Sequence, residues 1–282
     1  MLVYKAPIRD IRFLLETLGY DDVTQIAAFE DFDLDTMMAL VEQAGKFCTN
    51  EMLPANRIGD EEGVQFDPET KEVKTPAVFK ELYDKFVESQ MGGMSLTPEY
   101  GGGGAPHAAA IALSEMSTAT NKSFTMCPGL GHGLVEALTH YGSDEQKDIF
   151  LEKLITGVWT GTMCLTEPQC GTDLGLLSTK AIPHEDHYKL TGTKIWITWG
   201  EHDLAENIIH FVLGRLPDAP EGIRGISAFI VPKINLDGSR NGIYCGGLEH
   251  KMGIHGSPTC VMNLDDATGY LVGEAHKGMR AM

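Results

Sequence analysis

The hydrophobic pattern of this chain changes its period near residue 157, and this change limits the folds that the chain can adopt. Before that point, apolar residues recur at intervals of three and four, which is the spacing of amphipathic helices. After it, short runs rich in β-branched and aromatic residues alternate with turn residues, which is typical of antiparallel strands. Helices followed by strands favour two packed units and disfavour a doubly wound nucleotide-binding fold. The length of 282 residues fits two such units.

The clearest predicted helix follows Thr75-Pro76, a cap residue and a proline suited to a first helical turn. Its inward stripe is expected to contain Val78, Phe79, Leu82, Tyr83, Phe86 and Val87. Similar helices are predicted over residues 34–47, 105–119, 130–141 and 143–154. Ser143 can cap the last of these, with Gln146 near the reciprocal capping position. We expect the first 150 residues or so to be entirely helical.

The second half predicts strands over residues 159–165, 177–182, 188–199, 207–213, 225–231 and 259–264. Residues 184–186 are expected to form the tip of a hairpin between the second and third strands. The predicted fold class is therefore α+β, with an N-terminal all-helical domain followed by an antiparallel β-barrel domain.

The charge balance bears on the partners that this chain can bind. Asp and Glu number 40 and Lys and Arg 22, so the formal net charge is −18. Such a surface repels phosphate backbones and anionic lipids, so neither nucleic acid nor a membrane is an expected partner. The start lacks the pattern of a secretory signal, and no run of 18 apolar residues occurs. These features predict a cytoplasmic protein.

Cysteine, histidine and glycine residues invite functional interpretations that their spacing does not support. The six cysteines form no Cys-x-x-Cys pair and no zinc-like pattern, so we expect reduced, structural thiols and no metal. His132 stands alone, and His250 with His255 lacks a further ligand. The glycine runs at 101–104 and 129–133 do not match a phosphate-binding motif, which favours loops and helix ends.

Two other segments carry residue types that suit a ligand site. Residues 165–173 form a strand end followed by a tight turn, in which Thr166 and Thr172 supply hydroxyls and Gly171 lets backbone come close to a ligand. In residues 194–199, strict alternation would place Trp196 and Thr198 on one face, with Ile195 and Ile197 on the other. An indole beside a hydroxyl suits a flat, partly polar ring. A tryptophan packed in the core is the alternative, because aromatic residues in strands are usually buried.

Five segments in this order resemble the acyl-CoA dehydrogenase family. They are residues 141–147, 165–173, 194–198, 251–259 and 272–279. The resemblance covers about residue 33 to the end and implies the family fold: a helical domain, a β-barrel domain and a C-terminal four-helix bundle. This chain is expected to supply the first two and to lack the bundle. The implied divisions are an N-terminal extension (1–32), the helical domain (33–156), the barrel (157–273) and the start of the missing domain (274–282).

The resemblance implies FAD as cofactor and assigns residues to it. Leu165 and Thr166 are expected near flavin N1 and O2, and Thr198 near N5 and O4. Gly171 and Thr172 would approach the pyrophosphate, and Thr172 would also face the substrate's pantetheine arm. The remaining expected contacts are Trp196 and Ile197 beside the isoalloxazine ring, and Met163 where relatives often carry an aromatic residue.

The reaction implied is α,β-dehydrogenation of an acyl-CoA thioester to the enoyl-CoA, with electrons passed to an electron-transfer flavoprotein. In relatives the base is a glutamate of the C-terminal bundle, so it is expected beyond Met282 and no catalytic residue is assigned within the chain. Glu167 is expected to be structural, and residues 1–282 alone are expected to bind FAD weakly or not at all and not to turn over. For the substrate, Gly129 would leave room for the acyl chain, and Arg215 would supply positive charge near CoA, although a surface arginine at a strand end is the favoured interpretation.

Residues 4–15 resemble the N-terminal extension of a bacterial branch of larger subunits, which favours 3-methylmercaptopropionyl-CoA as the substrate. Family members are usually homodimers or homotetramers, and the same is expected here. Two alternatives stay open: an acyl-CoA oxidase that passes electrons to oxygen, and a non-catalytic flavin-binding homologue.

Overall fold

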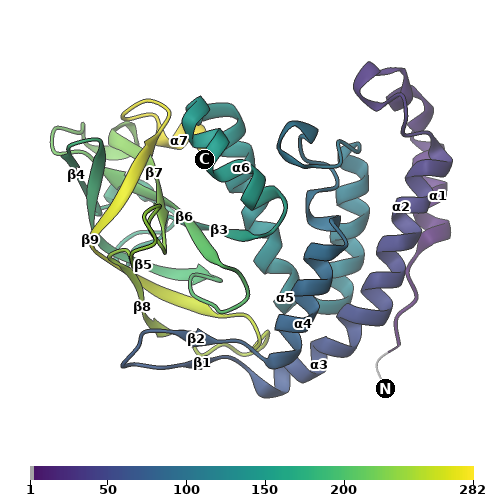
Figure 1. Ribbon diagram of the computed structural model, residues 1–282, viewed down its shortest axis with the longest axis horizontal. Coiled ribbons are helices and arrows are strands. Elements are labelled where there is room, and N and C mark those ends of the chain that lie inside the picture. The colour runs from purple at the N-terminus through teal and green to yellow at the C-terminus, as the bar shows by residue number, and fades with distance from the viewer. Residues whose placement is uncertain (1–2) are drawn as a thin grey trace.

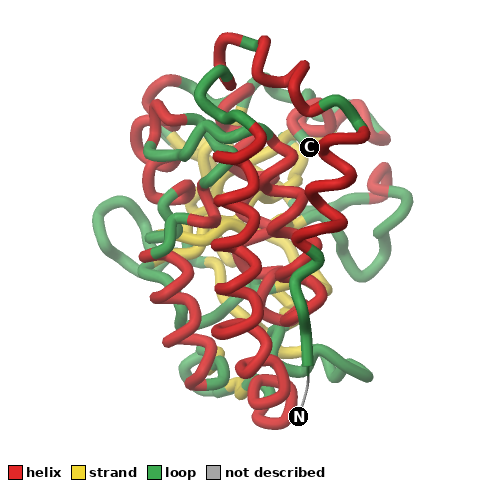
Figure 2. The backbone as a smooth tube through the Cα atoms, turned by 90° about the vertical axis from the view of Figure 1, so that its right-hand side faces the viewer, coloured by secondary structure: helices red, strands yellow, loops and turns green. Residues whose placement is uncertain are grey.

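The helical half of the molecule lies beside a sheet-rich half in the computed structural model, which describes residues 3–282 (Figure 1). Met1 and Leu2 of the expected N-terminal extension lie outside these residues. Turned by 90°, the molecule shows its helices crossing in front of the strands (Figure 2). The helices are α1 (Ile8–Thr17), α2 (Leu34–Phe47), α3 (Leu53–Glu62), α4 (Ala77–Glu88), α5 (His107–Tyr141), α6 (Asp144–Ile155) and α7 (Gly278–Ala281).

The helices with a clear apolar stripe lie where the sequence predicts them. In α4, the side chains of Phe79, Leu82, Tyr83 and Phe86 are buried. The capping box at the start of α6 is confirmed, because the Ser143 hydroxyl accepts from the Gln146 amide and the Gln146 side chain accepts from the Ser143 amide. The periodic burial of these stripes is what holds the helices together as one layer.

Helix α5 joins two segments that the sequence predicts as separate helices. The chain kinks at Asn121, where φ is −156° and ψ is 82°. The Asn121 side chain accepts from the Phe124 amide at 3.1 Å, as an N-cap residue does, and donates to the Met52 carbonyl at 3.2 Å. The kink therefore starts a second helical stretch, which contains Pro128 and Gly129.

The prediction of an entirely helical first half is wrong at one place. Residues 65–66 and 73–74 form a small antiparallel hairpin, β1 (Gln65–Phe66) and β2 (Val73–Lys74). Each strand has two residues, which is too short for an alternating pattern to be visible in the sequence. Helices α1 and α3 have no range of their own in the sequence prediction, although both agree with a helical first half, and Ile11 of α1 joins the core of the helical half.

The sheet-rich half contains seven paired strands. They are β3 (Trp159–Cys164), β4 (Lys180–His184), β5 (His187–Thr198), β6 (Asn207–Arg215), β7 (Ile226–Pro232), β8 (Ile243–Leu248) and β9 (Thr259–Val272). The pairings run in a ring from β6 through β4, β5, β9 and β7 back to β6, with β3 added beside β6 and β8 beside β9. The hairpin tip at 184–186 is confirmed, since His184 pairs with His187.

Purely antiparallel pairing, as predicted, is wrong for two strand pairs. Strand β6 runs parallel to β3 over six residue pairs and meets β4 in parallel at Arg215. The β4–β5 hairpin lies between β3 and β6 in the chain. Strand β6 then lies beside β3 and runs in the same direction.

Two strands differ from their sequence pattern. The Gly246-Gly247 pair hides β8, because two glycines resemble a loop. Strand β9 continues past the predicted end at residue 264, since Asp265 and Asp266 lie at a register shift with β5 and Asp266 has φ of +49°. Two consecutive acidic residues are typical of a turn in a sequence, whereas here they form a bulge within one strand.

Trp199, immediately after β5, joins the two halves. Its indole is buried, lies 6.3 Å from the Phe79 ring of α4 between centroids, and donates to the Ser123 carbonyl at 3.1 Å. A buried aromatic with a satisfied N–H contributes both packing and orientation. The end of β5 is thereby fixed against the helices. Within residues 3–282, none of the helices has the length and apolar character needed to cross a bilayer.

Candidate functional site

The turn after β3 presents the first group of predicted site residues. Glu167 and Cys170 exchange backbone hydrogen bonds of 2.8 and 3.0 Å, which closes a tight turn. Gly171 lies against Thr166, because a β-carbon placed on Gly171 would be 3.4 Å from the Thr166 methyl group. Thr172 follows in an exposed position. The turn therefore holds a glycine backbone and two threonines close together at the surface.

Strand β5 brings the second group beside this turn. The Ile195 amide donates to the Thr166 carbonyl at 2.9 Å, so the two motifs are directly joined. Lys194 pairs with Met262 of β9 and Ile197 pairs with Cys260, which leaves Ile195 and Trp196 opposite a single residue. This is a β-bulge, and bulges often redirect a side chain beside a functional site.

The bulge changes the strict alternation predicted for β5. Trp196 has φ of +58°, an uncommon value for a large residue, and its side chain is 60% exposed. Ile197 points into the core with 2% exposure, so only its backbone can contact a cofactor as predicted. Thr198 is half-buried at the end of the strand. The indole of Trp196 is thus presented to the surface next to the Thr166 turn.

The three threonines on this face present uncharged hydroxyls. Within residues 3–282, the hydroxyls of Thr166, Thr172 and Thr198 have no hydrogen-bond partner, whereas the hydroxyls of Thr179 and Thr193 are bonded to other side chains. An exposed indole, unpaired hydroxyls and a glycine turn form a suitable donor set for a flat, neutral heteroaromatic ring with polar edges. The residues present fit the isoalloxazine part of FAD.

A buried ion pair supports the face from beneath. Lys194 Nζ lies 2.8 Å from Glu167 Oε1 and also donates to the Leu165 carbonyl at 3.0 Å. Glu167 accepts further hydrogen bonds from the backbone and hydroxyls of Ser178 and Thr179. The sequence analysis assigned Lys194 no role, because β5 also carries Lys189 and several threonines and a second lysine there gives no signal of burial.

The pKa values of both Glu167 and Lys194 are lowered in the folded protein, for different reasons. Burial raises the pKa of Glu167, but the charge of Lys194 and the hydrogen bonds outweigh it and lower that pKa to about 2. Burial lowers the pKa of Lys194, and Glu167 opposes this change. A carboxylate with so many donors cannot take up a substrate proton near neutral pH. Glu167 therefore has the structural role expected for it.

A cavity of about 170 Å³ lies between the two parts of α5 and the turn at Met91. Its walls are mostly apolar and include Gly129, and a β-carbon on Gly129 would meet no atom within 4 Å. Met163 of β3 reaches the neighbouring turn of α5, since its sulfur would lie 3.8 Å from a β-carbon on Gly133. Gly129 therefore borders open space that an apolar chain can fill.

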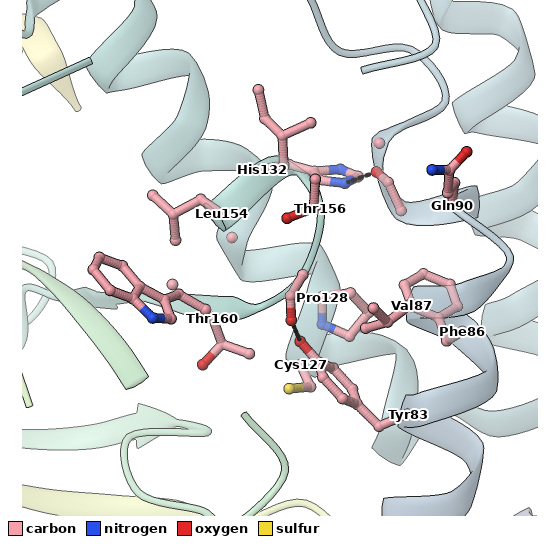
Figure 3. A pocket seen from close by; sticks show the side chains of 17 residues that line it. Tyr83, Phe86, Val87, Gln90, Cys127, Pro128, His132, Leu154, Thr156 and Thr160 are labelled. Atoms are coloured by element: carbon pink, nitrogen blue, oxygen red, sulfur yellow. Dashed lines mark hydrogen bonds between the residues drawn. The ribbon is translucent and has the colours of Figure 1, made fainter. Parts of the chain in front are cut away.

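His132 lines both this cavity and a second, smaller one (Figure 3). Its Nε2 lies 2.8 Å from the Gly92 carbonyl, and below it the Tyr83 hydroxyl donates to the Gly157 carbonyl at 2.8 Å. These bonds connect α5 to the turn after α4, and α4 to the loop after α6. His132 thus has a backbone hydrogen-bond partner within the helical half, and its interpretation as a packed histidine stays a prediction.

Arg215 does not have the position expected of a contact to CoA. Its guanidinium donates to four backbone carbonyls, those of Leu177, Pro220, Gly175 and Gly222. These bonds use the fork of donors that a phosphate would need. The prediction that Arg215 binds substrate is therefore replaced by a role in holding loops together.

The remaining expectations concern glycines, thiols and metals. The amides of Gly102, Gly103 and Gly104 donate to the carbonyls of Thr97, Gly93 and Leu96, so this glycine run cannot cradle a phosphate. All six cysteines are free and buried, and burial raises the pKa of Cys48 and of Cys164 to about 11. Among residues 3–282, no cluster of three or more potential metal ligands occurs.

Comparison with known families gives two adjoining matches. Residues 35–158 match the acyl-CoA dehydrogenase N-terminal domain, and residues 162–267 match the acyl-CoA dehydrogenase middle domain. The chain belongs to the acyl-CoA dehydrogenase family. Its members are flavoprotein enzymes, as the resemblance implied.

Individual relatives agree with this assignment. The chain is 45% identical to 3-methylmercaptopropionyl-CoA dehydrogenase of Ruegeria pomeroyi over 288 aligned residues, covering 100% of this chain and 49% of the relative. Butyryl-CoA dehydrogenase from Megasphaera elsdenii has a similar structure, with a TM-score of 0.72 and 28% identity over 87% of this chain and 60% of that one. An acyl-CoA dehydrogenase from Bacillus anthracis, solved in complex with FAD, has a TM-score of 0.72 and 27% identity over 89% and 39% of the two chains. The chain spans about half the length of the curated relative it matches.

Proposed function

We propose that this protein takes part in FAD-dependent α,β-dehydrogenation of an acyl-CoA thioester. The observation that carries the proposal is the surface formed by Trp196, Thr166 and Thr198, which the Ile195–Thr166 hydrogen bond holds together. An exposed indole on a strained bulge is costly unless it has a ligand to cover it. The FAD of the Bacillus anthracis relative supports the choice of ligand.

The chain's own residues would hold the cofactor from one side. Trp196 would pack beside the ring system, with the backbone of Ile197 and the side chains of Leu165 and Met163 adjoining it. The hydroxyls of Thr166 and Thr198 would donate to the polar edge of the ring, and Gly171 and Thr172 would approach the pyrophosphate. FAD supplies a hydride acceptor when it is bound.

The proton removed from the substrate needs a base with a pKa near the working pH. Glu167 is unsuited to this task because its pKa is held at about 2. We therefore propose that a glutamate outside residues 3–282 acts as the base. The role of this chain is to orient the cofactor and the thioester for that group.

For the substrate, we propose 3-methylmercaptopropionyl-CoA. The 45% identity to the Ruegeria pomeroyi enzyme supports this choice, and the alignment covers the N-terminal extension. The cavity at Gly129 would receive the acyl chain.

The dehydrogenase names of the relatives favour an electron-transfer flavoprotein over oxygen as the acceptor. We also propose that the ring of strand pairings forms a closed barrel. The proposed domain divisions lie at residues 32, 156 and 273. The proposed oligomer is a homodimer or homotetramer, and the proposed location is the bacterial cytoplasm.

The proposal is tested on the native protein together with the glutamate proposed to lie outside residues 3–282. It is purified with FAD, and candidate thioesters are added in the absence of oxygen. We expect 3-methylmercaptopropionyl-CoA to bleach the flavin absorbance and to yield the enoyl-CoA. Reoxidation by an electron-transfer flavoprotein is expected to be much faster than reoxidation by air. A flavin that bleaches but reoxidises at once in air would identify an oxidase, and a protein that binds no FAD would refute the proposal.

A further inference from the structure

Two loops meet at the edge of the sheet where β4 and β6 touch. The Thr172 loop (residues 170–178) follows the turn after β3, and the Gly222 loop (residues 216–225) connects β6 to β7. A β-carbon placed on Gly175 would lie 3.6 Å from the Gly222 Cα, so the loops are in contact. Neither loop has a strand partner of its own at this point, which is typical of segments that move.

The Arg215 side chain connects these loops. Its Nε donates to Leu177 O at 2.7 Å and its Nη2 to Gly175 O at 2.7 Å, both in the Thr172 loop. In the Gly222 loop, Nη2 donates to Gly222 O at 2.8 Å and Nη1 to Pro220 O at 3.1 Å. The planar guanidinium has a fixed fork of donors, so four such bonds determine how the loops lie relative to each other.

Further contacts hold Arg215 and the two loops in this arrangement. Its backbone amide donates to the Thr179 carbonyl at 2.8 Å, and Arg215 pairs with Lys180, which fixes the residue to the start of strand β4. A β-carbon on Gly225 would lie 1.8 Å from Pro220 O and 2.7 Å from Arg215 Nη1, so only glycine fits there. At the other end, Asp173 Oδ1 accepts from the Gly175 amide at 3.0 Å and ties the clasped segment to the residue after Thr172.

We propose that Arg215 is a positioning residue, which clasps the Thr172 loop to the Gly222 loop and thereby holds Thr172 in place for its ligands. This inference rests on the proposed function, in which Thr172 meets the flavin pyrophosphate and the pantetheine arm of the substrate. Arg215 itself touches neither ligand. A direct contact with a CoA phosphate would require the guanidinium to give up hydrogen bonds to carbonyls that would then lack partners.

Three variants of the native protein distinguish a positioning role of Arg215 from a direct contact with a phosphate. Arg215→Met removes both the charge and the donors. Arg215→Lys keeps the charge but cannot form the fork, because an ammonium is a compact group with no planar donor array. Arg224→Met is the matched control, since Arg224 lies in the Gly222 loop and is exposed.

The first readout is hydrogen exchange of the amides of residues 173–177 without any ligand. The second is the affinity for CoA and for pantetheine, which lacks the phosphates. We expect both Arg215 variants to exchange faster in this segment and to lose affinity for both ligands by about tenfold or more, because misplacing a contact group by about 1 Å has effects of this size. Arg224→Met is expected to behave as the wild type.

The inference is overturned if Arg215→Lys keeps wild-type exchange and affinity, or if the loss is confined to CoA, since either result would assign the effect to charge at a phosphate. It is also overturned if both Arg215 variants bind as the wild type does. A wild-type protein that binds neither FAD nor CoA would instead refute the proposed function, and the inference with it.

Discussion

The ammonium group of Lys194 lies 2.8 Å from Glu167 Oε1, and both side chains are buried. Glu167 belongs to the turn after β3 and Lys194 to β5, so the pair joins the two segments that carry the candidate flavin contacts. Breaking one partner of a buried pair is costly because the other charge is left without compensation.

Lys194→Met is therefore expected to lower the free energy of unfolding by about 3–5 kcal/mol. Urea denaturation at neutral pH measures the change. The double variant Glu167→Gln with Lys194→Met carries no buried charge, so it should recover most of the lost stability. Equal losses in the single and double variants would show that the pair is not coupled.

The same pair predicts a pH dependence. The pKa of Glu167 is about 2 in the folded protein against 4.5 for an ordinary glutamate. A depressed pKa gives stability that is complete above pH 4.5 and is lost as the pH falls toward 2. The contribution is about 3 kcal/mol. Unfolding free energies measured from pH 6 to pH 3 should fall more steeply for the wild type than for the double variant; parallel curves would contradict this assignment.

Trp196, in β5, and Trp199, immediately after β5, should respond in opposite ways to truncation. Trp196 is 60% exposed and Trp199 is 1% exposed. Trp196→Ala is expected to change stability by no more than about 0.5 kcal/mol and to weaken FAD binding by about tenfold or more. Trp199→Ala is expected to cost about 3–5 kcal/mol. Thermal melts and flavin titrations give both quantities, and normal FAD affinity in Trp196→Ala would remove Trp196 from the site.

Gly129 offers a test of the acyl cavity that leaves the fold intact. A β-carbon there meets no atom within 4 Å, so Gly129→Leu is expected to fold and to gain up to about 1 kcal/mol from helix propensity. The leucine would fill the cavity, so affinity should fall for thioesters with longer acyl chains and stay unchanged for CoA itself. Gly129→Ala serves as the graded control. Equal affinity across chain lengths in Gly129→Leu would place the acyl chain elsewhere.

Local patterns were sufficient to predict several elements. Helix α2 occupies residues 34–47 as predicted, because its apolar spacing lies within the segment and its Asp33 cap directly precedes it. The residue types of the Thr166 turn and of the Trp196 segment likewise indicated a ligand site. Their contact through the Ile195 amide could not be predicted from composition, since it depends on how β5 lies beside the end of β3.

Features that depend on distant partners were missed or misassigned. The bulge at Trp196 is set by the register of β5 with β9, which no alternation in β5 alone reveals. Arg215 looked like a free cation at a strand end, because its four carbonyl partners come from two loops separated in sequence. In both cases tertiary structure decided the orientation of the side chain.

Anaerobic titration of the FAD-loaded native protein with 3-methylmercaptopropionyl-CoA tests the central claim most directly. The account predicts that the flavin absorbance falls in proportion to the thioester added and that one enoyl-CoA forms per flavin bleached. A flavin spectrum that does not change at saturating thioester, in a protein with FAD bound, would contradict it.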